Sequence, residues 1–466
     1  MHTRALQTAL LATLALWLLA GCGSDVPDTV DQPNIILIST EATRPDHLSA
    51  YGYDRPTSTF MDSLAAEGVL FDSAYSVSSW TVPSVASLVT GTYPAAHKVQ
   101  HGVVQDAGSR TIQGQEMLSP ELPHLARILK AAGYKTFGIT ANGHLSKPLG
   151  YGEGFDFYRN LDFKAGSRLD AVSVNEIISN WKGQIKRGQP YFLWIHYFDP
   201  HDAYHARKPW IQEYFPLFAP HRQNFNKLTR ATPPTLSEMG LEPGSPEHEC
   251  LEALYDSEIN FANWAMEDIL HQLKVGPNAL IVLTSDHGEE FLDHGGFGHA
   301  STLYEEQIRV PLVVRLPGAR KKSVVQSTPV SLVDIAPTIL DYLHLEIPDQ
   351  MQGTSLMSLM NGRPRQVHEA IWTTVDQYAK MSAVRVGDWK LIVDHGEGDK
   401  PFLFNLVDDP AEVKNLAEDH PDRVAELLET MKGMEKTYGS DREALLNTEG
   451  LSEAEIEKLR SMGYVR

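Results

Sequence analysis

Three short segments of this sequence carry acidic, hydroxyl and imidazole groups that could bind a metal ion and an anion. In two of them the polar residues directly follow apolar runs: Glu41 follows residues 34–39, and Asp286 and His287 follow residues 279–284. Adjacent carboxylate and imidazole groups at the end of a strand are suitable ligands for a divalent metal. A single carboxylate such as Glu41 is more often an ordinary loop residue, so this interpretation depends on the segments lying together.

The remaining segment, residues 79–91, places several small hydroxyl residues at the start of an expected helix, and Thr81 is one of them. Hydroxyl oxygens and backbone N–H groups at the positive end of a helix form a natural binding site for an anion. A helix N-cap with no other role would show the same residue types. The segment therefore becomes informative only in combination with the acidic ones.

A scaffold of strands and helices must bring these distant segments together. Short apolar runs rich in β-branched residues predict buried strands at residues 34–39, 136–140, 191–197, 279–284 and 310–315. Apolar residues at helical spacing predict helices at residues 57–67, 121–132 and 252–273. Buried strands that alternate with helices predict an α/β fold with a mostly parallel sheet between helix layers. Such sheets bind ligands at the carboxyl ends of their strands, where the acidic segments fall.

Two other regions differ from this pattern of alternating strands and helices. Residues 202–249 are rich in proline, histidine and aromatic residues without a clear period, so we expect a long surface excursion that could act as a lid. Beyond about residue 366 we predict a small antiparallel subdomain, with strands at residues 371–375, 383–386, 390–393 and 402–406 and a helix at 421–438. In the tail, Ser452 and Glu455 have the spacing of a capping box.

Together the three polar segments resemble the sulfatase family of the alkaline phosphatase superfamily. The family signature is Cys or Ser followed by x-Pro-Ser-Arg and, after a helix, Thr-Gly; here T-V-P-S-V stands at residues 81–85 and T-G at 90–91. Residues 285–298, 309–311 and 387–392 match later family motifs, and the resemblance runs from about Asn34 to the C-terminus. It implies a large, mostly parallel sheet between helix layers with a small antiparallel C-terminal subdomain.

The resemblance also implies metal-dependent cleavage of an anionic ester. Glu41, Thr81, Asp286 and His287 correspond to the first metal shell, and Thr81 corresponds to the nucleophile. A metal there would hold the Thr81 oxygen as an alkoxide and polarise the ester oxygens. One divalent ion is expected, and the ligands leave zinc, manganese, calcium and magnesium open.

Four further residues correspond to family positions near the substrate: Asn142, His144, His201 and His299. His201 and His299 are also expected to take part in catalysis, because His201 could protonate the leaving oxygen and His299 could stabilise the developing charge. The same two histidines could hold a second metal ion. A structural role is equally compatible with Asn142 and His144.

The sequence departs from the family at three positions. Thr81 replaces the Cys or Ser that the family converts to formylglycine, Val85 replaces the accompanying Arg, and Glu41 stands where an Asp ligates calcium. A hydrated formylglycine releases sulfate by elimination, but threonine has no second hydroxyl and cannot use that route. Its covalent intermediate must instead be attacked at phosphorus or sulfur. We therefore predict hydrolysis of a phosphate ester or phosphodiester through a covalent Thr81 intermediate.

Three alternatives stay open at this point. A sulfuric ester hydrolase would fit the resemblance of the rest of the chain, and a phosphoryl-group transferase of a bacterial envelope would fit the Thr nucleophile. A catalytically inactive envelope-binding protein could use the same pocket, although the intact Thr81, Asp286 and His287 argue against it. Metal content discriminates, because an inactive relative would tolerate an empty site.

The first residues resemble a bacterial lipoprotein signal. Arg4 precedes the apolar run of residues 10–19, and L-A-G-C at residues 19–22 resembles a lipobox. The resemblance implies cleavage before Cys22, acylation of that cysteine and attachment to a membrane of the cell envelope, at the outer membrane or its periplasmic face. An ordinary signal peptide or a short anchor helix is the alternative. The other cysteine, Cys250, is expected to be structurally inert.

The bulk properties limit the partners and the domain organisation. The 466-residue chain has a formal net charge of −20, which argues against nucleic acid as a partner. We expect a signal peptide with lipobox at residues 1–22, a linker at 23–33, a catalytic domain at 34–365 and a C-terminal subdomain at 366–466.

Overall fold

The computed structural model describes residues 32–105, 112–161, 169–185, 189–318, 323–363, 366–448 and 456. Two units are distinguished along the chain, residues 1–33 and residues 34–466, and the second unit contains the elements discussed below. The expected signal peptide, Cys22 and the capping box of Ser452 and Glu455 lie outside the described residues.

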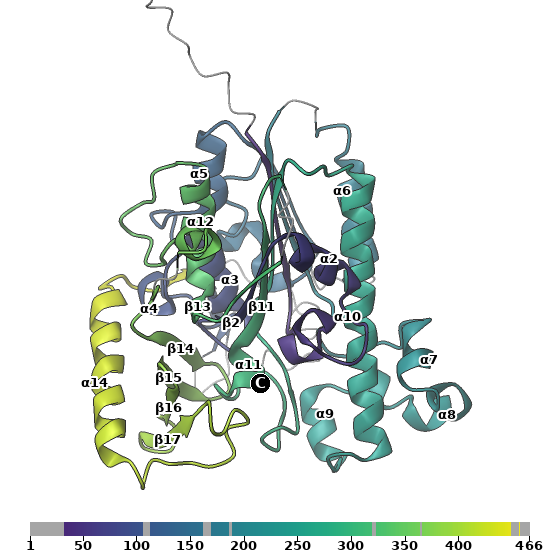
Figure 1. Cartoon of the computed structure of the whole chain (residues 1–466), viewed down its shortest axis with the longest axis vertical. Helices are drawn as coiled ribbons and strands as arrows, with labels where there is room; N and C mark the ends of the chain where they lie inside the picture. Colours follow the sequence, from purple (N-terminus) through teal and green to yellow (C-terminus); the bar gives the residue numbers. More distant parts are fainter. Residues whose placement is uncertain are drawn as a thin grey trace, which may run out of the picture. The chain divides into compact units, whose positions relative to one another are not determined.

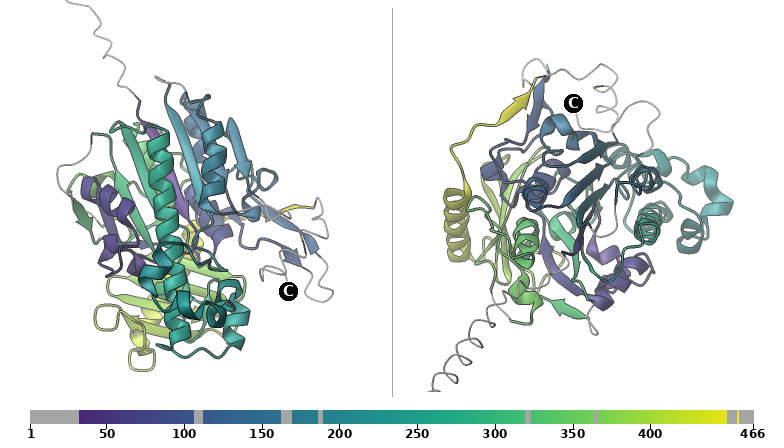
Figure 2. Two further views of the ribbon diagram at one scale, coloured as in Figure 1. Left: turned by 90° about the vertical axis from the view of Figure 1, so that its right-hand side faces the viewer. Right: turned by 90° about the horizontal axis from the view of Figure 1, so that it is seen from above.

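The main sheet runs between two layers of helices (Figures 1 and 2). In spatial order its strands are β12 (Val324–Gln326), β2 (Val69–Tyr75), β11 (Arg309–Arg315), β8 (Ala279–Ser285), β1 (Asn34–Thr40), β7 (Tyr191–Tyr197), β5 (Lys135–Thr140) and β6 (Phe157–Asn160), and β13 (Val330–Ser331) also pairs with β2. Strand β11 is antiparallel to both β8 and β2, and the other pairs are parallel. The predicted mostly parallel α/β sheet is therefore confirmed.

Strand β1 shows why apolar runs predicted this sheet. Ile35 and Leu37 pack into the hydrophobic cluster on one face, and Ile36 and Ile38 pack into the cluster on the other. A strand covered on both faces needs apolar side chains at every position rather than at alternate ones. An apolar run does not show whether a strand is parallel or antiparallel to its neighbours. The antiparallel orientation of β11 was therefore not predicted.

Helices cover the two faces of the sheet separately. One layer contains α2 (Thr59–Glu67), α6 (Ala171–Asn180) and α10 (Pro246–Gln272), and the other contains α3 (Thr81–Thr90), α5 (Leu125–Ala131) and α12 (Ile335–Tyr342). The predicted helix at 252–273 begins earlier, at Pro246, because Ser245 accepts a hydrogen bond from the His248 N–H and caps the first turn.

The segment between β7 and α10 contains short helices, which the sequence did not reveal. They are α7 (Trp210–Tyr214), α8 (Phe218–Phe225) and α9 (Pro233–Glu238). Ile211, Phe225 and Leu236 are buried against the cluster that α10 also faces. Helices of five to eight residues are too short to show a hydrophobic period.

The predicted small antiparallel sheet in the C-terminal part is confirmed, with four strands and one helix beside it (Figure 1). Its strands are β14 (Ile371–Asp376), β15 (Lys380–Val386), β16 (Trp389–Asp394) and β17 (Lys400–Asn405), and the helix is α14 (Pro421–Tyr438). Leu427 and Met431 of α14 pack against Val384, Leu391 and Val393 of the sheet.

Smaller elements complete the fold. Strand β18 (Leu445–Asn447) pairs with β4 (Ile112–Met117), which pairs with β3 (Val104–Gln105), and β9 (Glu290–Phe291) pairs with β10 (Phe297–Gly298). The short helices are α4 (Pro94–His97), α11 (Glu305–Ile308), α13 (Met357–Met360), η1 (Pro45–His47), η2 (Ser49–Tyr51), η3 (Gly143–Leu145), η4 (Lys147–Leu149), η5 (Leu228–Arg230) and η6 (Leu332–Asp334). Within the described ranges, no helix has both the length and the apolar character needed to cross a bilayer.

Candidate active site

The carboxyl ends of adjacent strands bring the acidic segments together. Strand β1 lies between β7 and β8, and Thr40 is in register with Tyr197 on one side and with Ser285 on the other. Glu41 and Asp286, each one residue further along, therefore lie on neighbouring strand ends. Thr81 is the first residue of α3 and is buried. The sheet register thus places the sequence-predicted metal ligands at one edge.

Glu41 and Asp286 are buried carboxylates, each with one oxygen for which the described residues provide no hydrogen-bond partner. Glu41 Oε1 accepts hydrogen bonds from Asn142 Nδ2 at 2.8 Å and from His196 Nε2 at 3.0 Å. Asp286 Oδ1 accepts from the backbone N–H groups of Ala42 and His287. The oxygens without such a partner are Glu41 Oε2 and Asp286 Oδ2. Burial, together with the charge of Glu41, raises the pKa of Asp286 to about 7.

Thr81 lies beside an imidazole whose tautomer is fixed. Thr81 Oγ1 is 3.2 Å from His287 Nε2, and His287 Nδ1 is 2.8 Å from the carbonyl oxygen of Gly288. A carbonyl only accepts, so Nδ1 carries the proton and Nε2 presents its lone pair to Thr81. Burial and the neighbouring His299 lower the pKa of His287 well below its usual range, which keeps the imidazole neutral.

These four residues fit a divalent metal ion. Two carboxylate oxygens without hydrogen bonds, one neutral imidazole nitrogen and one hydroxyl are a suitable donor set, and buried carboxylates require a cation nearby. The residues that would hold the ion are Glu41, Thr81, Asp286 and His287. Thr81 Oγ1 and His287 Nε2 lie 3.2 Å apart. Two ligands of the same ion can have this separation, because each metal–ligand distance is about 2.0–2.2 Å.

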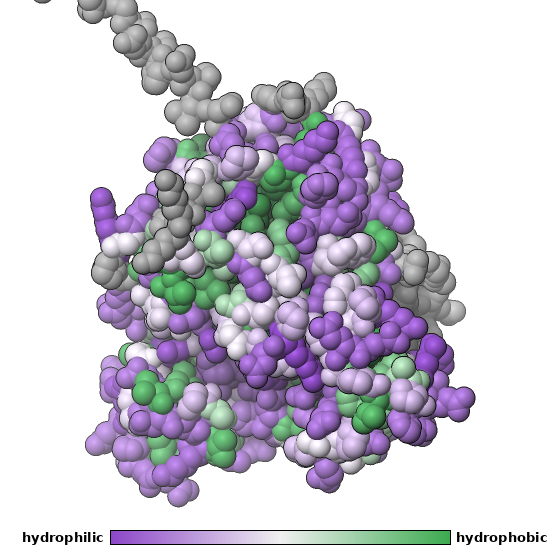
Figure 3. Space-filling view, turned by 45° about the vertical axis from the view of Figure 1, so that its right-hand side comes forward, coloured by the Kyte–Doolittle hydropathy of each residue, from purple (hydrophilic) through white to green (hydrophobic). Residues whose placement is uncertain are grey.

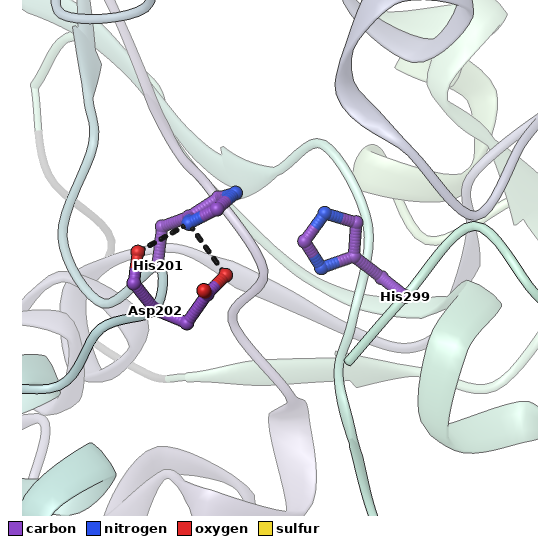
Figure 4. A group of neighbouring side chains, drawn as sticks. All are labelled: His201, Asp202 and His299. Carbon is purple, nitrogen blue, oxygen red and sulfur yellow. Dashed lines mark hydrogen bonds and ion pairs between the residues drawn. The ribbon is translucent and has the colours of Figure 1, made fainter. Parts of the chain in front are cut away.

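A second cluster lies next to this one and contains His201, Asp202 and His299 (Figure 4). His201 Nδ1 is 2.7 Å from the Asp202 carbonyl oxygen and 2.9 Å from its carboxylate. His299 Nδ1 is 2.9 Å from Glu289 Oε1, and its ring lies 5.0 Å from that of His201. Burial opposes a charge on His201, but Asp202, Glu41 and Glu289 outweigh it and raise the pKa of His201 to about 10.

The structure gives Asn142 and His144 internal contacts. Asn142 Nδ2 donates to Glu41, and its Oδ1 accepts from the His144 N–H at 2.9 Å, so both ends of this side chain are engaged within the protein. His144 is buried beside Gly102, where an added Cβ would fall 2.7 Å from the imidazole ring. Burial lowers the pKa of His144 to about 4. Asn142 therefore acts here by holding Glu41 in place.

Sequence reasoning missed His196 and Glu289 as members of the site. His196, in β7, bonds Glu41 through Nε2 and lies 2.9 Å from Ser39 Oγ through Nδ1. Glu289 accepts hydrogen bonds from the Tyr204 hydroxyl and from His299. A polar residue inside an otherwise apolar strand was the available signal for His196, since a buried histidine needs partners.

A cavity of about 350 Å³ adjoins the second cluster. Its lining is Leu169, Asp170, Phe198, Asp199, His201, Asp202, Ala203, His205, Arg207 and Glu258. Arg207 bonds Glu258 and Asp199 across this lining, and the Phe198 ring stacks on His201.

Comparison with known proteins decides the family. The sequence model of the sulfatase family matches residues 33–345, which is more than half of the chain. The chain belongs to the sulfatase family. A second model, the C-terminal part of N-sulphoglucosamine sulphohydrolase, matches residues 293–437. As a member of this family the chain is an ester-hydrolysing enzyme, and the family is typically metal-dependent, in agreement with the ligand set around Glu41 and Asp286.

Sulfatase relatives match over most of their length. The N-acetylglucosamine-6-O-sulfatase of Bacteroides thetaiotaomicron is 24% identical and aligns with 92% of this chain and 91% of its own length. The ulvan-active sulfatase of Formosa agariphila is 27% identical, over 84% of this chain and 78% of its own.

Solved structures show the same fold. The phosphonate monoester hydrolase of Agrobacterium radiobacter superposes with a TM-score of 0.70 and 20% identity, covering 89% of this chain and all of that one. A protein solved in complex with its substrate D-glucosamine-2-N,6-O-disulfate superposes with a TM-score of 0.68 and 20% identity, covering 87% and 98%. The sulfatase fold therefore holds for this chain as predicted.

Proposed function

We propose that this sulfatase-family enzyme hydrolyses a phosphate ester or phosphodiester through a covalent intermediate on Thr81. The observation that carries the proposal is the placement of Thr81 Oγ1 at 3.2 Å from the neutral His287 nitrogen, which itself lies 3.6 Å from Asp286 Oδ1. A divalent ion bound by these groups would supply the positive charge that keeps Thr81 ionised, with its proton released to solvent.

Threonine favours phosphorus over sulfur as the attacked atom. A nucleophile with a single hydroxyl cannot release sulfate by elimination, so water must attack the covalent intermediate directly. A phosphothreonine can be hydrolysed by such an attack, because the same positive charge that would assist the first displacement would also assist the second.

The proposed reaction has two displacements. In the first, a bond forms between Thr81 Oγ1 and phosphorus while the bond from phosphorus to the leaving oxygen breaks. The charged His201 gives its proton to that oxygen, so an alcohol leaves. In the second, neutral His201 takes a proton from water as the water oxygen attacks phosphorus and the Oγ1–phosphorus bond breaks. Both residues return to their starting states.

The surroundings of Thr81 assist these steps. Backbone N–H groups at the start of α3 point toward a negative charge at Thr81. We place the alcohol part of the substrate in the cavity beyond His201, whose hydrogen-bonding side chains suit a hydroxylated group.

A sulfate ester is the second candidate substrate. It is favoured by the relatives, because the curated sulfatases that match most of this chain are named for sulfated substrates. In that case the same residues would act, and a sulfo group would be transferred to Thr81.

A rate comparison tests the proposal. The full chain, purified in detergent and loaded in turn with zinc, manganese, magnesium and calcium, is given aryl phosphate, aryl phosphodiester and aryl sulfate. We expect a phosphorus ester to be cleaved faster than the sulfate. Thr81→Ala should lower the rate at least 1000-fold, roughly the loss of a covalent nucleophile, and a rapid acid quench should show phosphate on Thr81 by mass spectrometry.

The matched control is Thr90→Ala at the other end of α3, where the hydroxyl bonds only within the helix and to Thr92. It should retain the wild-type rate. Faster cleavage of the sulfate ester, with sulfate recovered on Thr81, would replace the leading proposal by the second candidate.

A further inference from the structure

We propose that the groove between α6 and α10 is a distal binding subsite for a glycan chain whose ester-bearing end lies in the active site. The inference rests on the proposed function and deepens it, because it names the class of substrate as an ester carried by an oligosaccharide or polysaccharide. The two helices lie side by side on one face of the sheet (Figure 2), and the groove between them has a volume of about 490 Å³.

The groove continues the line of the cavity beside His201. That cavity is bounded by Asp170, the N-cap of α6, and by Glu258 of α10, and Arg207 forms ion pairs with both carboxylates. The groove is lined by the next turns of the same two helices, as far as Asp268 and beyond on α10. At about 1.5 Å per residue, Glu258 and Asp268 lie roughly 15 Å apart along the helix, so a ligand that reaches both must be a chain of several rings.

Two hydrogen bonds fix how the helices face each other along the groove. Asn175 Nδ2 of α6 donates to the carbonyl oxygen of Ala265 at 2.7 Å, and Ser179 Oγ donates to Gln272 Oε1 at 3.0 Å. Later residues of α6 therefore meet later residues of α10, in the same direction in which the cavity leads away from the reacting centre.

A row of stacked groups joins the cavity to the groove. The Arg207 guanidinium lies 4.0 Å from the centroid of the Phe261 ring. The ring centroids of Phe261 and Trp264 are 6.0 Å apart, with an angle of 26° between the ring planes. Trp264 lines the groove and is 47% exposed. Because an aromatic face carries partial negative charge, it attracts the C–H groups on the face of a pyranose ring, and Trp264 is the platform for such a ring.

Polar side chains surround this platform. Asn180 and Gln272 line the groove and can exchange hydrogen bonds with sugar hydroxyls. Glu176 and Asp268 add two negative charges to the lining, against one positive charge on Lys182, which donates to Gln272 Oε1 at 2.6 Å. The excess of negative charge disfavours an anionic sugar, so the subsite fits a pyranose that is neutral or carries an amine. A weak contact here strengthens binding because it lies on the same chain as the ester.

Calorimetric titration tests the subsite without turnover. The full chain, in a detergent without a sugar headgroup, is titrated with hexamers of glucose, N-acetylglucosamine and glucosamine, and with a hexamer of galacturonic acid as the anionic contrast. We expect one of the first three to bind and the anionic hexamer to bind more weakly. Trp264→Ala should weaken binding by about tenfold or more, and Trp264→Phe should stay within about threefold of the wild type. A loss in Glu176→Gln that is confined to the glucosamine hexamer would identify an amino sugar, and an unchanged affinity a neutral one.

The matched control is Leu217→Ala, which removes another exposed apolar side chain outside the groove and should bind the hexamers as the wild type does. Binding of none of the hexamers, preference for the anionic one, or unchanged affinity in Trp264→Ala would overturn the subsite. A monosaccharide that binds as tightly as its hexamer would reject the connection with the cavity. Cleavage of aryl phosphorus esters without hexamer binding would keep the proposed function and reject this subsite, whereas Trp264-dependent binding in an enzyme that cleaves only sulfate esters would do the reverse.

Discussion

Within the site, the proposed chemistry of Thr81 depends on residues that fix the orientation of the Glu41 carboxylate by hydrogen bonds. Glu41 has one more methylene than an aspartate, so its carboxylate needs more support to keep one orientation. Asn142 and His196 provide it by bonding the same oxygen, Oε1, and Oε2 remains as the oxygen that would bind a metal ion. Outer contacts of this kind orient a ligand and tune the ion that it binds.

Asn142→Ala tests this arrangement against the substrate-binding role expected from the sequence. Loss of the 2.8 Å bond to Glu41 should weaken metal binding by about 10–100-fold and lower kcat, with little change in KM. Metal titration and steady-state kinetics on the full chain measure these quantities. A higher KM with unchanged metal affinity would show instead that Asn142 contacts the substrate.

At the scale of elements, α3 is anchored by a neutral histidine. His97, the last residue of α4, donates from Nε2 to Ser87 of α3 at 3.0 Å, and its Nδ1 accepts from the Val99 N–H. Burial lowers the pKa of His97 to about 3. This link fixes the helix that carries Thr81 at its start.

The His97 link predicts a loss of stability in acid. Because its folded pKa lies below the unfolded value of 6.5, the unfolded chain binds the proton first and stability falls as pH drops from about 6.5 toward 3. Between pH 7 and pH 5 this amounts to about 2 kcal/mol. Urea unfolding of wild type and His97→Gln at both pH values measures the difference. The variant should lose less stability on acidification, and an equal loss in both would contradict the assignment.

Across the whole molecule, two features bear on where the enzyme acts. The face in Figure 3 is mostly hydrophilic with separate apolar patches, and the chain carries a net charge of −20. The membrane attachment expected from the sequence falls on Cys22, which lies outside the described residues.

We propose that Cys22 carries lipid and holds the enzyme at a membrane of the cell envelope. In a bacterium that expresses the full chain, the wild type should fractionate with membranes and be released by detergent but not by high salt. Cys22→Ser should move most of the protein to the soluble fraction with unchanged rates on aryl esters. Membrane retention of Cys22→Ser would reject the lipid anchor.

Much of the scaffold and part of the site were readable from the sequence. The five apolar runs identified the central strands because a strand buried on both faces needs apolar residues throughout. Glu41, Thr81, Asp286 and His287 could be named because their segments follow a strand or open a helix and resemble the motifs of the sulfatase family. Strand order, the antiparallel course of β11 and the short helices α7 to α9 required the structure, since pairing and local helix ends depend on contacts that no periodicity encodes.

The division between sequence and tertiary structure is clearest at the site itself. The sequence alone indicated the kind of chemistry, metal-dependent cleavage of an anionic ester, because the hydroxyl, carboxylate and imidazole groups stand in segments that resemble the motifs of the sulfatase family. Only the folded chain decided which groups face one another: His196 and Asn142 behind Glu41, Glu289 behind His299, and Asp202 beside His201. Asp202 and His201 are neighbours in the sequence, but the other pairs join residues from different strands and loops, and their contacts arise from the fold of the chain rather than from neighbouring positions in the sequence.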